Sequence, residues 1–164
     1  MSPAPSAFTL FHVILSLVGI FSGFIVAYGM LTSQRLNGWT AIFLWSTVLT
    51  SATGFLFPFH KLLPSHILGA MSFVTLAIAL YARYTRNLAG GWRRTYVITA
   101  VLSLYFNVFV LIVQLFTKIP ALHELAPTQS EAPFKVAQLV ALLVFIVLGV
   151  LAAKNFRAEQ FSAA

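Results

Sequence analysis

Residues 8–31 read FTLFHVILSLVGIFSGFIVAYGML and contain no charged side chain. At about 1.5 Å per residue, a helix of this length crosses the roughly 30 Å hydrocarbon core of a bilayer. Lipid offers the backbone no hydrogen-bond partners, so a spanning stretch of this kind must be helical. Four similar stretches follow: Trp39–Phe59, His66–Tyr84, Thr95–Phe116 and Phe134–Ala153. The sequence therefore predicts an all-α bundle of five transmembrane helices, with residues 1–164 forming a single membrane domain.

The composition supports this prediction and excludes several kinds of chemistry. Hydrophobic residues make up 60% of the 164 residues and charged residues 8%, whereas soluble domains carry about 25% charged residues. Cysteine is absent, which excludes disulfides, Cys-ligated zinc and iron–sulfur clusters. The chain also contains no Asp, so a Ser-His-Asp triad is impossible. The formal charge of +7 resides largely in loops beside apolar stretches, where it is typical of topology and headgroup contact rather than of nucleic-acid binding. These features favour a non-enzymatic role.

The distribution of Lys and Arg predicts the orientation of the chain. Five spans would place three of these residues on the side of the N-terminus and seven on the side of the C-terminus. The three are Lys61, Lys118 and Lys135, and the seven are Arg35, Arg83, Arg86, Arg93, Arg94, Lys154 and Arg157. Short loops rich in Lys and Arg stay in the cytoplasm. We therefore expect the N-terminus outside and the C-terminus inside.

Aromatic residues of the interfacial type mark the same side. Tyr and Trp prefer the headgroup level of a bilayer. Six of them fall at the cytoplasmic ends of their spans: Tyr28, Trp39, Tyr81, Tyr84, Trp92 and Tyr96. Arg83 also lies at a span end, where a long basic side chain can extend to the headgroups. At the opposite side, the spacing of Thr128 and Glu131 predicts a capping box for the last span.

Small and polar residues predict how the helices pack. Gly19, Gly23 and Ala27 form a ridge at four-residue spacing that allows another helix to approach closely. Asn107 lies in the middle of its span. An amide facing lipid would lack a hydrogen-bond partner. We therefore expect Asn107 to be buried and bonded to another helix.

A layer of polar residues near the outer boundary is the candidate site. His12, Thr53, Gln114 and Gln138 lie within about two turns of that boundary, and His66 lies at the boundary itself. Polar groups that converge within apolar walls are typical of a ligand pocket. Phe57, Phe59 and Phe116 are the expected walls. The alternative is that the histidines, with His60 and His123 in the loops, are interfacial anchors.

The chemistry of this layer leaves the ligand open. A neutral imidazole can bond a quinone oxygen or ligate haem iron or another metal, so quinone and haem b are the cofactors considered, and the metal remains unknown. Only His12 and His66 are placed on facing helices for a two-histidine haem. Two other functions remain open. One is an uncoupled solute or lipid facilitator that uses Ser46, Thr50 and Asn107. The other is a structural subunit whose partner is another membrane protein or a second copy of the chain.

Two stretches resemble segments of small bacterial inner-membrane proteins of uncharacterised function. They are SATGFLFPF at residues 51–59 and LAPTQSEAPF at residues 125–134. The resemblance implies a location in the bacterial cytoplasmic membrane and carries no chemistry with it.

Overall fold

The computed structural model describes residues 6–57 and 64–157, apart from the side chains of residues 64 and 65. These ranges are helical and contain no strand. The helices are α1 (Ala7–Leu31), α2 (Asn37–Gly54), α3 (Pro64–Leu80), the π-helical segment η1 (Tyr81–Thr85), α4 (Trp92–Lys118), α5 (Pro120–Leu125) and α6 (Ala132–Asn155). The all-α prediction is thereby confirmed for the described residues.

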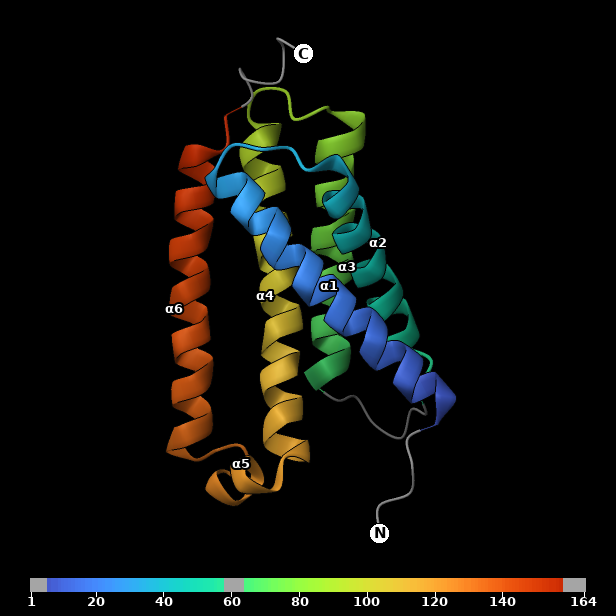
Figure 1. Cartoon of the computed structure of the whole chain (residues 1–164), viewed down its shortest axis with the longest axis vertical. Helices are drawn as coiled ribbons and strands as arrows, with labels where there is room; N and C mark the ends of the chain where they lie inside the picture. Colours follow the sequence, from blue (N-terminus) through green and yellow to red (C-terminus); the bar gives the residue numbers. More distant parts are fainter. Residues whose placement is uncertain (1–5, 58–63, 158–164) are drawn as a thin grey trace.

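The long helices run alternately up and down, and α1 crosses the others obliquely (Figure 1). The start of α1 lies at the same end as α5, whereas the end of α6 lies at the opposite end with the loops 32–36 and 86–91. Helix α4 is central because it packs against α1, α2, α3 and α6. Helix α6 packs mainly on α4, and only 11% of the residues in its apolar 18-residue stretch are buried.

Four described helices are long and apolar enough to cross a membrane: α1, α3 continued by η1 (His66–Thr85), α4 and α6. Helix α2 is not apolar enough to be counted with them, because it is rich in hydroxyl residues. Those hydroxyls are turned inward: Thr40, Ser46, Thr47, Thr50 and Ser51 are all buried. The exposed face of α2 carries Trp39, Ile42, Trp45 and Leu49.

The predicted ridge on α1 is a packing surface. Gly19, Gly23 and Ala27 are all buried. A Cβ at Gly23 would lie 2.5 Å from Leu104 Cδ1 of α4 and 3.0 Å from the Phe43 ring of α2. The absence of a side chain at residue 23 therefore lets α1 approach both helices closely.

Asn107 is placed as the sequence predicted. It is 8% exposed, and its Nδ2 donates to Thr47 Oγ1 of α2 at 3.2 Å. This bond joins two helices beneath α1, because the Cβ position of Gly19 is within 3.5 Å of the same Asn107 nitrogen. The expected interhelical role of the amide is confirmed.

One expected boundary and one expected helix cap differ from the structure. The second span was expected to run to Phe59, but α2 ends at Gly54 and residues 55 and 56 form a turn. Pro58 disfavours helical backbone at the residue before it, which fits an early end; Phe59 lies outside the described residues. The expected capping box also differs. Glu131, rather than Thr128, is the N-cap of α6, because Pro133 fits the first turn of a helix.

Arg83 and Tyr96 do not reach the interface as expected. Arg83 is 3% exposed, and its Nη2 donates to Asn37 Oδ1 at 2.6 Å and to the carbonyl oxygen of Arg35 at 3.1 Å. Its guanidinium lies 5.3 Å from the centre of the Tyr96 ring, which is also buried. One oxygen atom of the first loop and one at the start of α2 thus hold the cation inside the bundle, in place of the headgroups.

Candidate ligand-binding cavity

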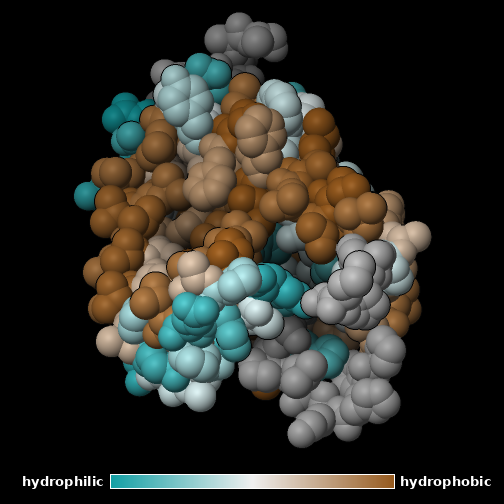
Figure 2. All heavy atoms as spheres, turned by 60° about the horizontal axis from the view of Figure 1, so that its bottom comes forward, coloured by the Kyte–Doolittle hydropathy of each residue, from teal (hydrophilic) through white to brown (hydrophobic). Residues whose placement is uncertain are grey.

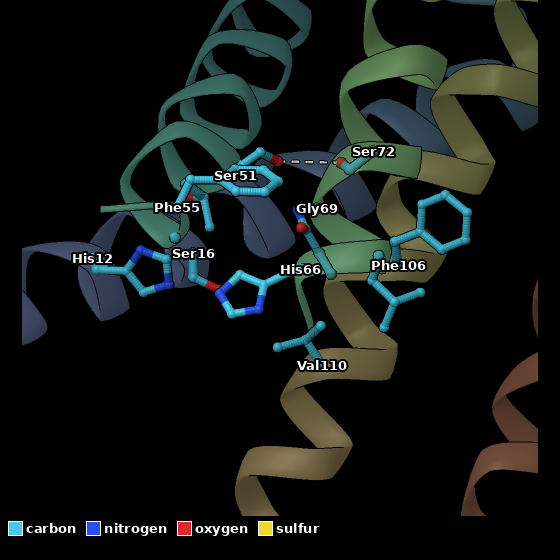
Figure 3. Close-up of a pocket in the computed structure, with 13 residues that line it drawn as sticks. His12, Ser16, Ser51, Phe55, His66, Gly69, Ser72, Phe106 and Val110 are labelled. Carbon is cyan, nitrogen blue, oxygen red and sulfur yellow. Dashed lines mark hydrogen bonds between the residues drawn. The ribbon is translucent and has the colours of Figure 1, made fainter. Parts of the chain in front are cut away.

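A cavity of about 110 Å³ lies between α1, α2, α3 and α4, toward the end of the bundle where α1 begins (Figure 3). Its described lining consists of His12 and Ser16 from α1, Thr50, Ser51, Gly54 and Phe55 from α2 and its terminal turn, His66, Leu68, Gly69 and Ser72 from α3, and Phe106, Asn107 and Val110 from α4. Four helices thus contribute polar side chains to one space with aromatic walls.

His12 is held in place from α2. Its Nδ1 lies 2.8 Å from Thr53 Oγ1, and the Thr53 hydroxyl also lies 2.7 Å from the carbonyl oxygen of Leu49. The edge of the imidazole packs against the Phe57 ring, with 5.2 Å between the ring centres. These contacts turn the second ring nitrogen, Nε2, toward Ser16 and His66 (Figure 3).

His66 enters the same space from the first turn of α3. It is 8% exposed, and its ring lies over Phe55 with 6.0 Å between the centres. Phe55 in turn stacks on Phe73 of α3. A Cβ at Gly69 would approach the Phe55 ring to 3.1 Å. The turn after α2 is therefore packed tightly against α3, which fixes one wall of the cavity.

Thr50 provides a polar group without a partner inside the protein. Its side chain is 9% exposed, it lines the cavity, and its Oγ1 is buried with no hydrogen bond. The hydroxyls of Ser51 and Ser72 are paired instead, since Ser51 donates to Ser72 at 3.3 Å. A buried hydroxyl without a partner is costly. Thr50 thus brings an unsatisfied hydroxyl group to the wall of the cavity.

The structure brings together only part of the predicted polar layer. His12 and His66 share the cavity, and Thr53 supports it through His12. Gln114 is exposed about two turns beyond Asn107 on α4. Gln138 lies on α6, and its Nε2 donates to the carbonyl oxygen of Phe109 at 3.2 Å. Because α6 packs on the side of α4 away from α2 and α3, Gln138 does not line this cavity.

The aromatic walls also differ from expectation. Phe55 and Phe106 line the cavity, whereas Phe57 only touches the outer edge of His12. Phe116 packs against Phe134 where α4 meets α6, with 5.4 Å between ring centres. His123 is exposed on α5, and His60 lies outside the described residues.

Sequence reasoning missed three serines of the lining. Ser16, Ser51 and Ser72 reach the cavity from three different helices. Ser16 shares a helix face with the Gly19–Gly23 ridge, which was the only signal available in the sequence. Ser51 and Ser72 reach the cavity because of the order in which the helices pack around the bundle, and the sequence does not reveal this order.

The end of the molecule near the cavity is also polar on its surface. Figure 2 shows hydrophilic side chains gathered at the end that comes forward, with hydrophobic flanks behind them and a hollow beside them. A second hollow of about 270 Å³ lies between α4 and α6 and is lined by apolar residues with Tyr105 and Gly149. It has the character of a surface that holds lipid chains rather than of a site with specific polar contacts.

The dimensions of the first cavity restrict what it can hold. Pockets for drug-sized ligands measure roughly 300–1,000 Å³, so a porphyrin ring does not fit between His12 and His66 as they stand. Within residues 6–57 and 64–157, no three His, Asp or Glu side chains are grouped to hold a metal ion. A dry cavity of about 150 Å³ holds benzene. The cavity here is smaller, at about 110 Å³, so the part of a ligand that enters it can be no larger than a single small ring or headgroup.

No protein-family model matches the chain, and no curated protein or solved structure is significantly similar to it. The class of protein must therefore be read from the fold itself. Four helices suited to crossing a membrane, in described residues that contain no strand, indicate a multi-pass membrane protein.

Proposed function

We propose that this chain is a non-enzymatic, five-span protein of the bacterial cytoplasmic membrane that binds the polar head of a lipophilic ligand, such as a quinone. The observation that carries the proposal is the convergence of His12, His66, Ser16 and the unpartnered Thr50 hydroxyl on one cavity. The ligand's apolar tail would remain in the surrounding lipid.

The proposal treats α2 as the fifth span. Its 18 residues correspond to about 27 Å of helix. Its hydroxyl groups face α1, α3 and α4, and the side chains on its outer face are apolar or aromatic. This distribution suits a helix in lipid, because the polar groups that lower its hydropathy are satisfied or enclosed within the bundle.

The proposed orientation places the cavity in the outer leaflet. Among the described residues, the end of the bundle with the loops 32–36 and 86–91 carries the basic side chains of Arg35, Arg83, Arg86, Arg93, Arg94, Lys154 and Arg157. The opposite end, near the cavity, carries Lys118 and Lys135. The basic end would face the cytoplasm. Reporter fusions after Ala164 should then read cytoplasmic and fusions within 122–130 periplasmic, and the reverse pattern would contradict this orientation.

Ligand binding is tested by filling the cavity. Ser16→Phe places a ring in the space beside His12 and His66, whereas Leu17→Phe places the same ring at the next residue, which is 49% exposed on the outside of the bundle. Both variants and the wild type are purified in native lipid discs, and their organic extracts are compared by mass spectrometry. We expect a lipophilic compound enriched over bulk lipid in the wild type and Leu17→Phe but lost in Ser16→Phe. Equal enrichment in all three, or none in any, would contradict the proposal.

A further inference from the structure

The hydrogen bonds around His12 specify which form of ligand the cavity prefers. The Thr53 hydroxyl has one proton and lies 2.7 Å from the carbonyl oxygen of Leu49 and 3.1 Å from that of Thr50. A carbonyl oxygen only accepts, so the Thr53 proton is directed to these carbonyls. Thr53 Oγ1 must then accept from His12 Nδ1–H across 2.8 Å.

This arrangement fixes the tautomer of the neutral imidazole. When Nδ1 carries the proton, Nε2 carries a lone pair and accepts a hydrogen bond. Nε2 is the nitrogen that faces Ser16 and His66 across the cavity (Figure 3). The cavity therefore presents a fixed acceptor from α1, and the Thr50 hydroxyl from α2 has no protein partner.

The residues that line the cavity carry no formal charge that could pair with a charged headgroup. Within the described lining there is no Lys, Arg, Asp or Glu. A phosphate or an ammonium headgroup would thus be desolvated without a counter-charge, at a large cost. A neutral head with a hydroxyl group avoids this cost, because its proton can be donated to His12 Nε2.

Resting on the proposed function, we infer that the ligand head is a neutral hydroxylated ring, a hydroquinone or phenol, whose hydroxyl donates to His12 Nε2. The oxidised quinone offers only carbonyl acceptors to the acceptor nitrogen of His12. Thr53 is a positioning residue, because it acts on the ligand through the tautomer of His12.

The test compares the affinities of three related probes. A short-chain benzohydroquinone, its quinone and its dimethyl ether are titrated calorimetrically into lipid discs that contain the protein, with empty discs as the baseline for partition. One hydrogen bond of about 1.4 kcal/mol corresponds to tenfold in affinity. We expect the hydroquinone to bind about tenfold more tightly than the quinone or the ether. His12→Leu should remove this preference, and His123→Leu, at an exposed histidine outside the cavity, should retain it.

Variants at Thr53 test whether this residue acts by positioning His12 or only by supporting the fold. Thr53→Val removes the acceptor that holds the Nδ1 proton of His12, so the preference for hydroquinone over quinone should fall several-fold. Thr53→Ser keeps a hydroxyl acceptor, so the preference should remain. If the quinone binds as tightly as the hydroquinone, the assignment of a hydroxylated ring is wrong although the cavity still binds a lipophilic head. If neither probe binds above the baseline, the proposed function itself is contradicted for this class of ligand.

Discussion

Adding one methyl group at Gly23 should destabilise the bundle measurably. The new Cβ would lie 2.5 Å from Leu104 Cδ1 and 3.0 Å from the Phe43 ring. Both neighbours are 1% exposed, so neither can swing away without displacing other core residues. Overpacking of this kind costs about 1–3 kcal/mol. Because each 1.4 kcal/mol is tenfold in an equilibrium constant, Gly23→Ala should shift the unfolding equilibrium by about five- to a hundredfold.

Gly149→Ala is the matched control. It makes the same change within a long apolar helix, but its Cβ would meet only Val101 Cγ1 at 3.6 Å, an ordinary contact. Unfolding of both variants in mixed micelles by increasing SDS, followed by circular dichroism, gives the two free energies. We expect Gly149→Ala to match the wild type or exceed it slightly, since alanine favours the helix. Equal stabilities for the two variants would refute the close packing of α1 against α2 and α4.

Three further perturbations test other parts of the structure. Asn107→Leu removes the bond to α2 and should cost about 0.6–1.7 kcal/mol in the same unfolding assay; an unchanged stability would mean that the amide contributes nothing. Arg83→Met removes the hydrogen bonds of a buried guanidinium to Asn37 Oδ1 and to the carbonyl oxygen of Arg35 and should cost about 1.5–3 kcal/mol, whereas Arg86→Met, at an exposed position, should stay within about 0.5 kcal/mol. The Thr128 hydroxyl donates to Glu131 at 2.7 Å and lowers the pKa of the Glu131 carboxyl. The stability that this carboxylate contributes is therefore present above the ordinary pKa of a glutamate and is lost as the pH falls through the lowered pKa. Thr128→Val should bring the pKa of Glu131, measured by NMR titration, back toward its ordinary value.

Hydropathy and residue size predicted much of the fold. Long uncharged stretches predicted the helices because only helices satisfy the backbone in lipid. The spacing of Gly19 and Gly23 predicted a close helix contact, and the polarity of Asn107 predicted an interhelical bond. Each of these inferences depends on one helix alone, so a single sequence contains the necessary information.

Features that depend on neighbouring helices were not predictable. The depth of Gln138 in its span suggested a place beside His12, but α6 packs on the far side of α4. Arg83 was expected to extend to headgroups, yet oxygen atoms of Arg35 and Asn37, which are distant from it in sequence, hold it inside the bundle. The partner of a polar side chain depends on which helix lies opposite it. The order of the helices around the bundle is a property of the assembled structure and cannot be read from one helix alone.

The most direct test of the proposed cavity is to map where a ligand head lies. A photoreactive benzohydroquinone with a short tail is cross-linked to the protein in lipid discs, and the labelled residues are identified by peptide mass spectrometry. We expect labels on residues 12–16 of α1 and 106–110 of α4, and we expect Ser16→Phe to abolish them. Labels confined to the apolar hollow between α4 and α6, around Tyr105 and Phe145, would contradict it.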